Sequence, residues 1–123
     1  PDFCVAVDVT HGRTPDSPKD EAFVMGGGPA VGIGPNMTRW MARRLLDKGA
    51  AENIPVQKEI MERSSGTNGW GMQIANEGVA TAVLSIPLKY MHTPVEVVEL
   101  GDIEDAARLL VAFTVGLGKE GAQ

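Results

Sequence analysis

The sequence predicts an α/β fold, a layered mixed sheet with flanking helices, and three observations indicate it. Three stretches with helical spacing of apolar residues are interleaved with strand-like stretches. Residues 3–9 are apolar on both faces apart from Asp8, as in a strand that is covered on both sides. The stretch 81–100 combines an apolar strand, a proline, a histidine and a second proline. Functional groups of layered sheets gather at the carboxyl ends of strands, where we expect Asp8 and His92.

The totals are those of an ordinary globular domain and exclude several classes of protein. The 123 residues fit one domain, with 43% hydrophobic and 22% charged residues and a net charge of −5. There is no basic cluster, so we expect no nucleic-acid partner. No apolar run approaches the roughly 20 residues that span a bilayer, and no signal peptide is visible. We predict a soluble, cytoplasmic protein without a membrane partner.

The chain begins Pro-Asp-Phe-Cys, without an initiator methionine or a turn before the first strand. We therefore expect it to be a piece of a longer polypeptide. Its lone cysteine, Cys4, permits no internal disulfide, fits a reducing cytoplasm and is predicted to be a small buried side chain.

The expected elements alternate strands with helices along the whole chain. In order, they are a strand at 3–9, a loop at 10–20, a short strand near Val31 and Ile33, a helix at 37–52, a strand at 55–60, a turn at 63–69, a helix from Trp70 to Gly78, a strand at 79–86, an extended segment at 95–100 and a helix at 102–117. Asn36 and Asp102 are expected to cap the first and last helices. Pro87 has no N–H to donate, so we expect it to stop its strand.

The glycine-rich stretch 23–35 resembles a phosphate-binding loop at first sight. Its spacing does not match Gly-x-Gly-x-x-Gly, and Ile33 stands where a phosphate loop needs a lysine. We interpret these glycines as positions of positive φ or of close backbone approach.

Asp8 and His92 would suit as two ligands of Zn²⁺ or a similar divalent ion, which accepts carboxylate oxygen and imidazole nitrogen together. Other candidates show no ligand spacing such as His-x-x-x-His; they are His11, Asp16, Asp20 and Glu96. Two other interpretations stay open, namely that Asp8 orders its own loop by accepting backbone N–H bonds and that His92 is a hydrogen-bonded turn residue. No Gly-x-Ser-x-Gly elbow indicates a serine nucleophile.

Six motifs follow one another along the chain: AVDVT (6–10), GGP (27–29), NIPVQ (53–57), SSGT (64–67), GVATAVLSIP (78–87) and YMHTPVEVVE (90–99). Together they resemble the carboxyl-terminal part of the glutamyl/leucyl aminopeptidase family of dinuclear metallopeptidases. Members are also labelled deblocking aminopeptidase, cellulase M or endoglucanase. The resemblance covers nearly all of residues 1–123, but only roughly the last third of a family member.

The resemblance implies a partial zinc-peptidase-like catalytic domain in which Asp8 ligates one metal ion and His92 the other. Two divalent ions, Zn²⁺ or Co²⁺, would activate a bridging water while a glutamate takes its proton. That glutamate and the remaining ligands belong to the upstream part of the same polypeptide. The resemblance therefore implies no catalytic residue in this chain, absent or incomplete metal binding, and no activity of the chain by itself.

By the same resemblance, Thr67, Asn68 and Lys89 belong to the wall that binds the peptide substrate. Family members often have Thr-Asp-Ala where this chain has Thr67, Asn68 and Gly69, so a carboxylate is lost beside the cleft. Lys89 replaces a common arginine, which keeps the charge but not the bidentate geometry.

We therefore expect part of a metal-dependent aminopeptidase that hydrolyses N-terminal residues from peptides and forms a homo-oligomer. The alternative is a non-catalytic α/β accessory or binding module. A β-glucan hydrolase is less favoured, because no two carboxylates pair recognisably as that reaction requires. We also expect the sheet to expose a strand edge or apolar patch that pairs with another chain.

Overall fold

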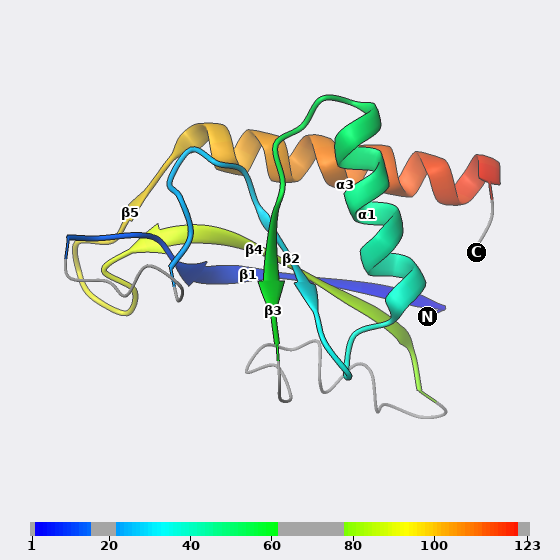
Figure 1. The fold of residues 1–123 in the computed structure, drawn as a ribbon, viewed down its shortest axis with the longest axis horizontal. Coiled ribbons are helices and arrows are strands. Elements are labelled where there is room, and N and C mark those ends of the chain that lie inside the picture. The colour runs from blue at the N-terminus through cyan, green and yellow to red at the C-terminus, as the bar shows by residue number, and fades with distance from the viewer. Residues whose placement is uncertain (1, 16–21, 62–77, 121–123) are drawn as a thin grey trace.

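The computed structural model describes residues 2–15, 22–61 and 78–120 (Figure 1). Its elements, in chain order, are β1 (Phe3–His11), β2 (Ala30–Ile33), α1 (Arg39–Ala51), β3 (Gln57–Ile60), β4 (Ala80–Lys89), β5 (Val97–Val98) and α3 (Leu100–Glu120). Strands and helices are interleaved, and the predicted α/β class is confirmed. The predicted turn at 63–69 and the helix from Trp70 lie outside the described residues, as do Thr67 and Asn68.

The sheet is mixed, as predicted. Its strands are ordered β1-β4-β2-β3, and β5 pairs with the far end of β4. β1 runs parallel to β4 and β2 runs parallel to β3, whereas β4 is antiparallel to both β2 and β5. Figure 1 shows β1 and β4 crossing β2 and β3 steeply, so the sheet is strongly twisted.

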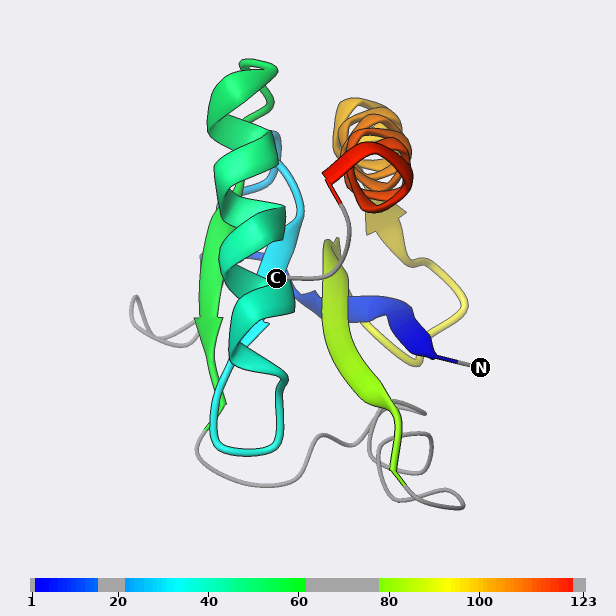
Figure 2. The same ribbon diagram turned by 90° about the vertical axis from the view of Figure 1, so that its right-hand side faces the viewer.

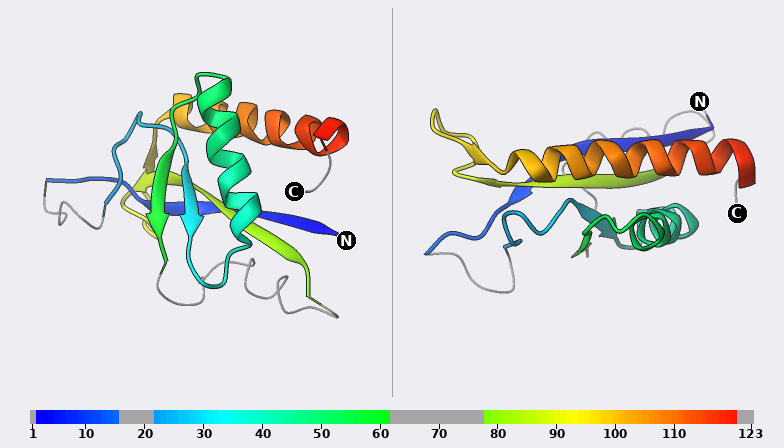
Figure 3. Two further views of the ribbon diagram at one scale, coloured as in Figure 1. Left: turned by 45° about the vertical axis from the view of Figure 1, so that its right-hand side comes forward. Right: turned by 90° about the horizontal axis from the view of Figure 1, so that it is seen from above.

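One face of the sheet is covered by both α1 and α3, and we call it the helix face. β4 contributes Ala82 and Leu84 to this face, and β2 contributes Val31, which pairs with Leu84. These side chains pack against buried residues of the two helices, namely Met41, Ala42, Leu45, Ala106, Leu109 and Phe113. Figure 2 shows α1 beside β2 and β3 and α3 above β4, and in the view from above in Figure 3 α3 lies over β1 and β4. Burial of each large side chain contributes about 1.5–3 kcal/mol.

The opposite face of the sheet is covered by neither described helix. Residues paired across neighbouring strands point to the same side, so Asp8 shares this face with Ser85. Thr10 lies two residues beyond Asp8 on that side. Glu59 of β3 pairs with Gly32, and both lie on that side because the preceding Val31 points to the helices. We call this the polar face, after Asp8, Thr10, Glu59, Ser85 and Lys89.

Pro87 does not stop β4, which continues to Lys89, so that prediction is wrong. The N–H of Gly12 donates to the carbonyl of Leu88 at 2.9 Å, so Leu88 bonds toward β1 and the nitrogen of Pro87 points the other way. On that other side the partner of β4 changes, because β2 reaches only Ser85 and β5 begins opposite Leu88. Pro87 therefore lies where the sheet needs no donor.

Helix α1 begins later than predicted, and its N-cap is Thr38 rather than Asn36. Thr38 makes no side-chain cap bond. Instead its hydroxyl accepts the N–H of Thr81 at 2.9 Å, while its own N–H donates to the carbonyl of Thr81 at 2.8 Å. This paired contact attaches the start of α1 to β4. The N-cap residue of α1 is therefore tied to a strand residue 43 positions further along the chain.

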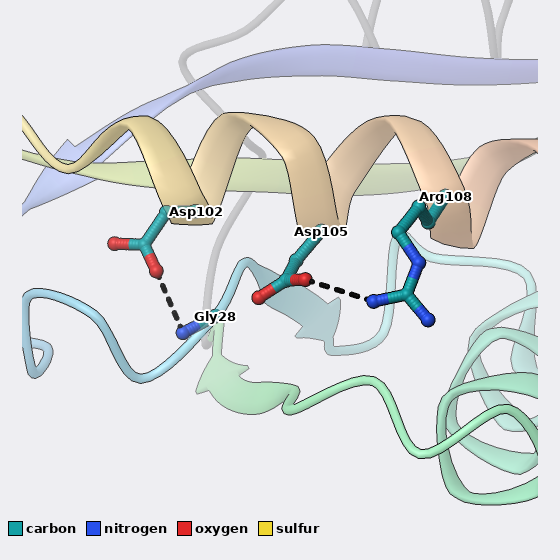
Figure 4. Close-up of polar contacts among 4 residues, drawn as sticks. All are labelled: Gly28, Asp102, Asp105 and Arg108. Atoms are coloured by element: carbon teal, nitrogen blue, oxygen red, sulfur yellow. Dashed lines mark hydrogen bonds and ion pairs between the residues drawn. The ribbon is translucent and has the colours of Figure 1, made fainter.

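Asp102 does not cap α3, which begins at Leu100. Its carboxylate is fully buried and accepts the backbone N–H groups of Gly26 and Gly28, each at 2.9 Å. Figure 4 shows the bond to Gly28. The predicted cap is thus replaced by a tie between the last helix and the glycine-rich stretch.

The glycine-rich stretch follows the predicted interpretation. Gly26 and Gly28 have φ values of +83° and +91°. A Cβ on Gly28 would overlap the carbonyl of Pro55, so only glycine fits at this close approach.

The remaining boundaries differ by a few residues. β1 includes Thr10 and His11, so the following loop starts later than expected, and Cys4 is half-buried rather than buried. Apolar side chains are exposed on both outer strands, namely Val7 on β1 (51%) and Ile60 on β3 (69%). This exposure fits the expected apolar edge of the sheet. That the edge pairs with another chain stays a prediction. Within the described ranges no helix is long and apolar enough to cross a membrane.

Candidate functional site

The polar face carries the candidate site because two parallel strands deliver its residues. β1 holds Asp8, and β4 leads through Lys89 into the turn that holds His92. The two strands pair along nine consecutive positions, from Phe3 with Ala80 to His11 with Leu88. Asp8 lies within its strand rather than at the very end, whereas His92 follows the end of β4 as expected.

Asp8 is half-buried, and one of its carboxylate oxygens is engaged locally. Its Oδ1 accepts the N–H of Val9 at 2.8 Å, which is the kind of bond expected if Asp8 orders its own backbone. Among the described residues, its Oδ2 has no hydrogen-bond partner. A carboxylate held through one oxygen presents the other to a ligand.

His92 lies in a tight turn, and its imidazole is exposed. Its N–H donates to Oε1 of Glu96 at 3.2 Å, and both the N–H and the hydroxyl of Thr93 donate to the carbonyl of Tyr90. His92 and Tyr90 have φ values of +64° and +58°. Such conformations cost about 1–3 kcal/mol each for residues other than glycine and are found at functional sites. The turn is therefore hydrogen-bonded through its backbone, while the imidazole of His92 stays available.

The chemistry of Asp8 and His92 fits a divalent metal ion, but the described donor set is incomplete. A free carboxylate oxygen and an exposed imidazole are both ligands that Zn²⁺ accepts. In the part of the chain that the structure describes, no group of three or more His, Cys, Asp or Glu residues is arranged to hold a metal ion. Any complete site therefore needs donors from elsewhere.

Two further residues of the polar face, Thr10 and Glu59, were not identified from the sequence. The hydroxyl of Thr10 donates to Oε2 of Glu59 at 2.7 Å. The sequence predicts a strand at 55–60 but does not indicate which of its faces is buried. In the structure Ile60 is exposed and Glu59 is the residue with a buried atom. Only the register of β3 against β2 reveals this, and no local pattern could have.

The predicted substrate residues can be placed only in part. Lys89 is half-buried at the end of β4 and points to the polar face by strand alternation. Thr67 and Asn68 lie outside the described ranges.

Hollows of about 640 and 680 Å³ lie on the other side of the sheet. One is between α1 and α3, and the second is between α1 and the end of β2 and β3. None of Asp8, Glu59, Lys89 and His92 lines either hollow. These hollows are therefore separate from the candidate site.

Comparison with known proteins decides the family. The sequence profile of the M42 glutamyl aminopeptidase family matches residues 1–109. The chain belongs to this family. The resemblance found in the sequence motifs is thereby confirmed.

Relatives of this M42 chain include curated and structurally solved aminopeptidases. Lysyl aminopeptidase of Pyrococcus furiosus is 39% identical over 114 residues, which are 92% of this chain and 33% of the relative. The structure of an aminopeptidase from the archaeon Desulfurococcus kamchatkensis is 34% identical, with a TM-score of 0.81 over 92% of this chain and 34% of its own.

A third relative forms large assemblies. The TET1 peptidase of Pyrococcus horikoshii, which can assemble into a tetrahedron or a large octahedral shell, is 25% identical. Its TM-score is 0.71 over 91% of this chain and 32% of its own. The M42 chain spans about a third of the length of these relatives.

Proposed function

We propose that this chain is one segment of the catalytic domain of a metal-dependent aminopeptidase. The whole enzyme would remove N-terminal residues from peptides in the cytoplasm. The observation that carries the proposal is the parallel pairing of β1 with β4 in a member of the M42 family, because it sets the strand of Asp8 beside the strand that ends at His92.

Asp8 and His92 are proposed as ligands of two different divalent ions, Zn²⁺ or Co²⁺. When bound, such ions would supply Lewis-acid chemistry, which is a lowered pKa of metal-bound water and polarisation of the scissile carbonyl. The role of this chain is to hold its two ligands in place. Asp8 is braced by the N–H of Val9, and His92 is braced by the hydrogen-bonded turn between Tyr90 and Glu96.

The remaining parts of the site would come from the upstream part of the same polypeptide, including the glutamate that takes the proton. Lys89, Thr67 and Asn68 are proposed to contact the peptide. The wild-type enzyme is proposed to be a homo-oligomer, in line with the assemblies of the TET1 peptidase.

The test is hydrolysis of aminoacyl anilides by the full-length enzyme and by this segment, each with added Co²⁺ or Zn²⁺. We expect metal-dependent turnover by the full-length enzyme and none by the segment. An inactive full-length enzyme would favour the accessory-module alternative. Turnover by the segment would contradict the assignment of the general base to the upstream part.

A further inference from the structure

A hydrogen bond connects the two outer strands across the polar face. Thr10, which is 7% exposed, donates from β1 to Glu59 on β3 at 2.7 Å, across a sequence separation of 49 residues. β1 and β3 are at opposite ends of the order β1-β4-β2-β3. The steep crossing of the strands, visible in Figure 1, brings these two ends of the order together. The contact thus links regions that share no backbone pairing.

Stability alone does not account for a carboxylate at position 59. Its second oxygen, Oε1, is buried and has no hydrogen-bond partner among the described residues. An unpaired buried polar atom costs about 1–3 kcal/mol, whereas a hydrogen bond to a charged group contributes about 1.5–3 kcal/mol. The two effects nearly cancel, so an apolar pair of similar shape would serve folding as well as Thr10 and Glu59 do.

The bond does restrain the strand that carries Asp8. Within the described ranges β4 is the strand that β1 pairs with. On its other side, in the same ranges, β1 is bonded only at its very end, where the carbonyl of His11 accepts the N–H of Phe23 and the N–H of Arg13 donates to the carbonyl of Phe23. Thr10 lies on the same face as Asp8, about 7 Å further along the strand. Fixing Thr10 to β3 therefore limits the movement of the segment that presents the Asp8 carboxylate. A metal ligand needs this restraint, because its position must be held within about 0.5 Å.

We propose that Glu59, acting through Thr10, is a positioning residue for the carboxylate of Asp8. The proposal rests on the proposed function, in which Asp8 is a metal ligand. Glu59 touches neither metal nor substrate in this role. Its hydrogen bond holds the carboxyl-terminal half of β1 so that Asp8 is presented in a fixed orientation on the polar face.

The decisive variant is the double substitution Thr10→Val with Glu59→Leu in the full-length enzyme. It replaces both partners by apolar groups of similar size, which can be nearly neutral for folding. We expect the Tm of the metal-free enzyme to stay within a few degrees of wild type. The affinity for one of two Co²⁺ ions, measured by titration calorimetry on the metal-free enzyme, should fall about 10- to 100-fold.

Conservative and control variants separate positioning from folding. Glu59→Gln keeps an acceptor for the hydroxyl of Thr10. Because the hydrogen bond is retained, Asp8 should stay in place, and the affinity for Co²⁺ should remain within about threefold of wild type. Thr114→Val removes the hydroxyl of an exposed threonine, which donates to the carbonyl of Leu110 within α3, and should leave metal binding unchanged. If the double variant does not fold, Thr10→Val alone should lower Co²⁺ affinity relative to Thr10→Ser.

Two results would overturn the proposal: wild-type Co²⁺ affinity in the double variant, or a loss of affinity that only parallels a loss of Tm. Failure of the proposed function is a different result, in which the wild-type enzyme itself binds no metal and hydrolyses no aminoacyl anilide.

Discussion

The two faces of the sheet differ in what their side chains do. On the helix face, Val31, Ala82 and Leu84 pack against α1 and α3 and form the core. On the polar face, β1 carries Asp8 and Thr10, β4 carries Ser85, and β3 adds Glu59. β4 therefore serves both purposes, because its successive side chains point to opposite faces. In such a strand, the side chains that stabilise the fold and the side chains of the candidate site therefore alternate along the chain.

This separation predicts that substitutions on the two faces have different consequences. Changes on the helix face should lower stability and leave metal affinity alone. Loss of His92, or of the bond between Thr10 and Glu59, should lower metal affinity and leave the stability of the metal-free enzyme nearly unchanged.

The largest effect is expected from His92→Ala in the full-length enzyme. Loss of a metal ligand should remove one metal ion per chain and lower kcat/KM by on the order of a hundredfold or more. The imidazole is exposed, so the Tm of the metal-free enzyme should not change. Elemental analysis and anilide kinetics check this. The matched control is His11→Ala, which removes the exposed histidine at the end of β1 and should keep both metal ions. If the His92→Ala enzyme still binds two metal ions per chain, His92 is not a ligand.

On the helix face, Leu109→Ala should give the largest loss of stability. Leu109 is fully buried between the helices and the sheet, so truncation leaves a cavity and costs about 2–5 kcal/mol. Thermal unfolding of the metal-free full-length enzyme measures it. Val111→Ala on the same helix, at a position that is 64% exposed, should change the Tm little. A fall in Co²⁺ affinity at Leu109→Ala beyond that explained by unfolding would contradict the separation of the two faces.

A smaller loss of stability is expected from Asp102→Asn. An amide has one acceptor oxygen, so one of the N–H groups of Gly26 and Gly28 loses its partner, at a cost of about 1–3 kcal/mol. Asp105→Asn is the control one turn further along α3. Its ion pair with Arg108 spans 3.4 Å at the surface and contributes less than about 1 kcal/mol (Figure 4). Equal Tm values for the two variants would mean that the glycine-rich stretch does not depend on Asp102.

The smallest effect is expected from Lys89→Met, which tests the proposed contact with the peptide. Removing one half-buried charge should raise KM for a peptide substrate about fivefold, with little change in kcat, because a partly exposed charge contributes at most about 1 kcal/mol. Steady-state kinetics with Lys89→Arg as the charge-retaining control measures it. If the variant instead loses metal and keeps its KM, Lys89 supports the metal site and does not contact the substrate.

Part of the candidate site could be predicted from the sequence because its signals are local. The apolar run 79–86 and the motif around His92 predict a strand followed by a turn residue, and the structure has both, although β4 extends to Lys89. The position of Asp8 in an apolar run predicts a carboxylate on an otherwise hydrophobic strand. Whether these two residues bind metal stays a prediction.

The sequence by itself determined the alternation of strands and helices, the mixed sheet class and the family, since apolar spacing and short motifs are properties of neighbouring residues. Only the tertiary structure decided the N-cap of α1 at Thr38, the continuation of β4 through Pro87, the burial of Asp102 and the contact between Thr10 and Glu59. Each of these depends on a partner far away in the chain. Local propensity does not encode such a partner, because register and packing choose it only when the strands and helices come together.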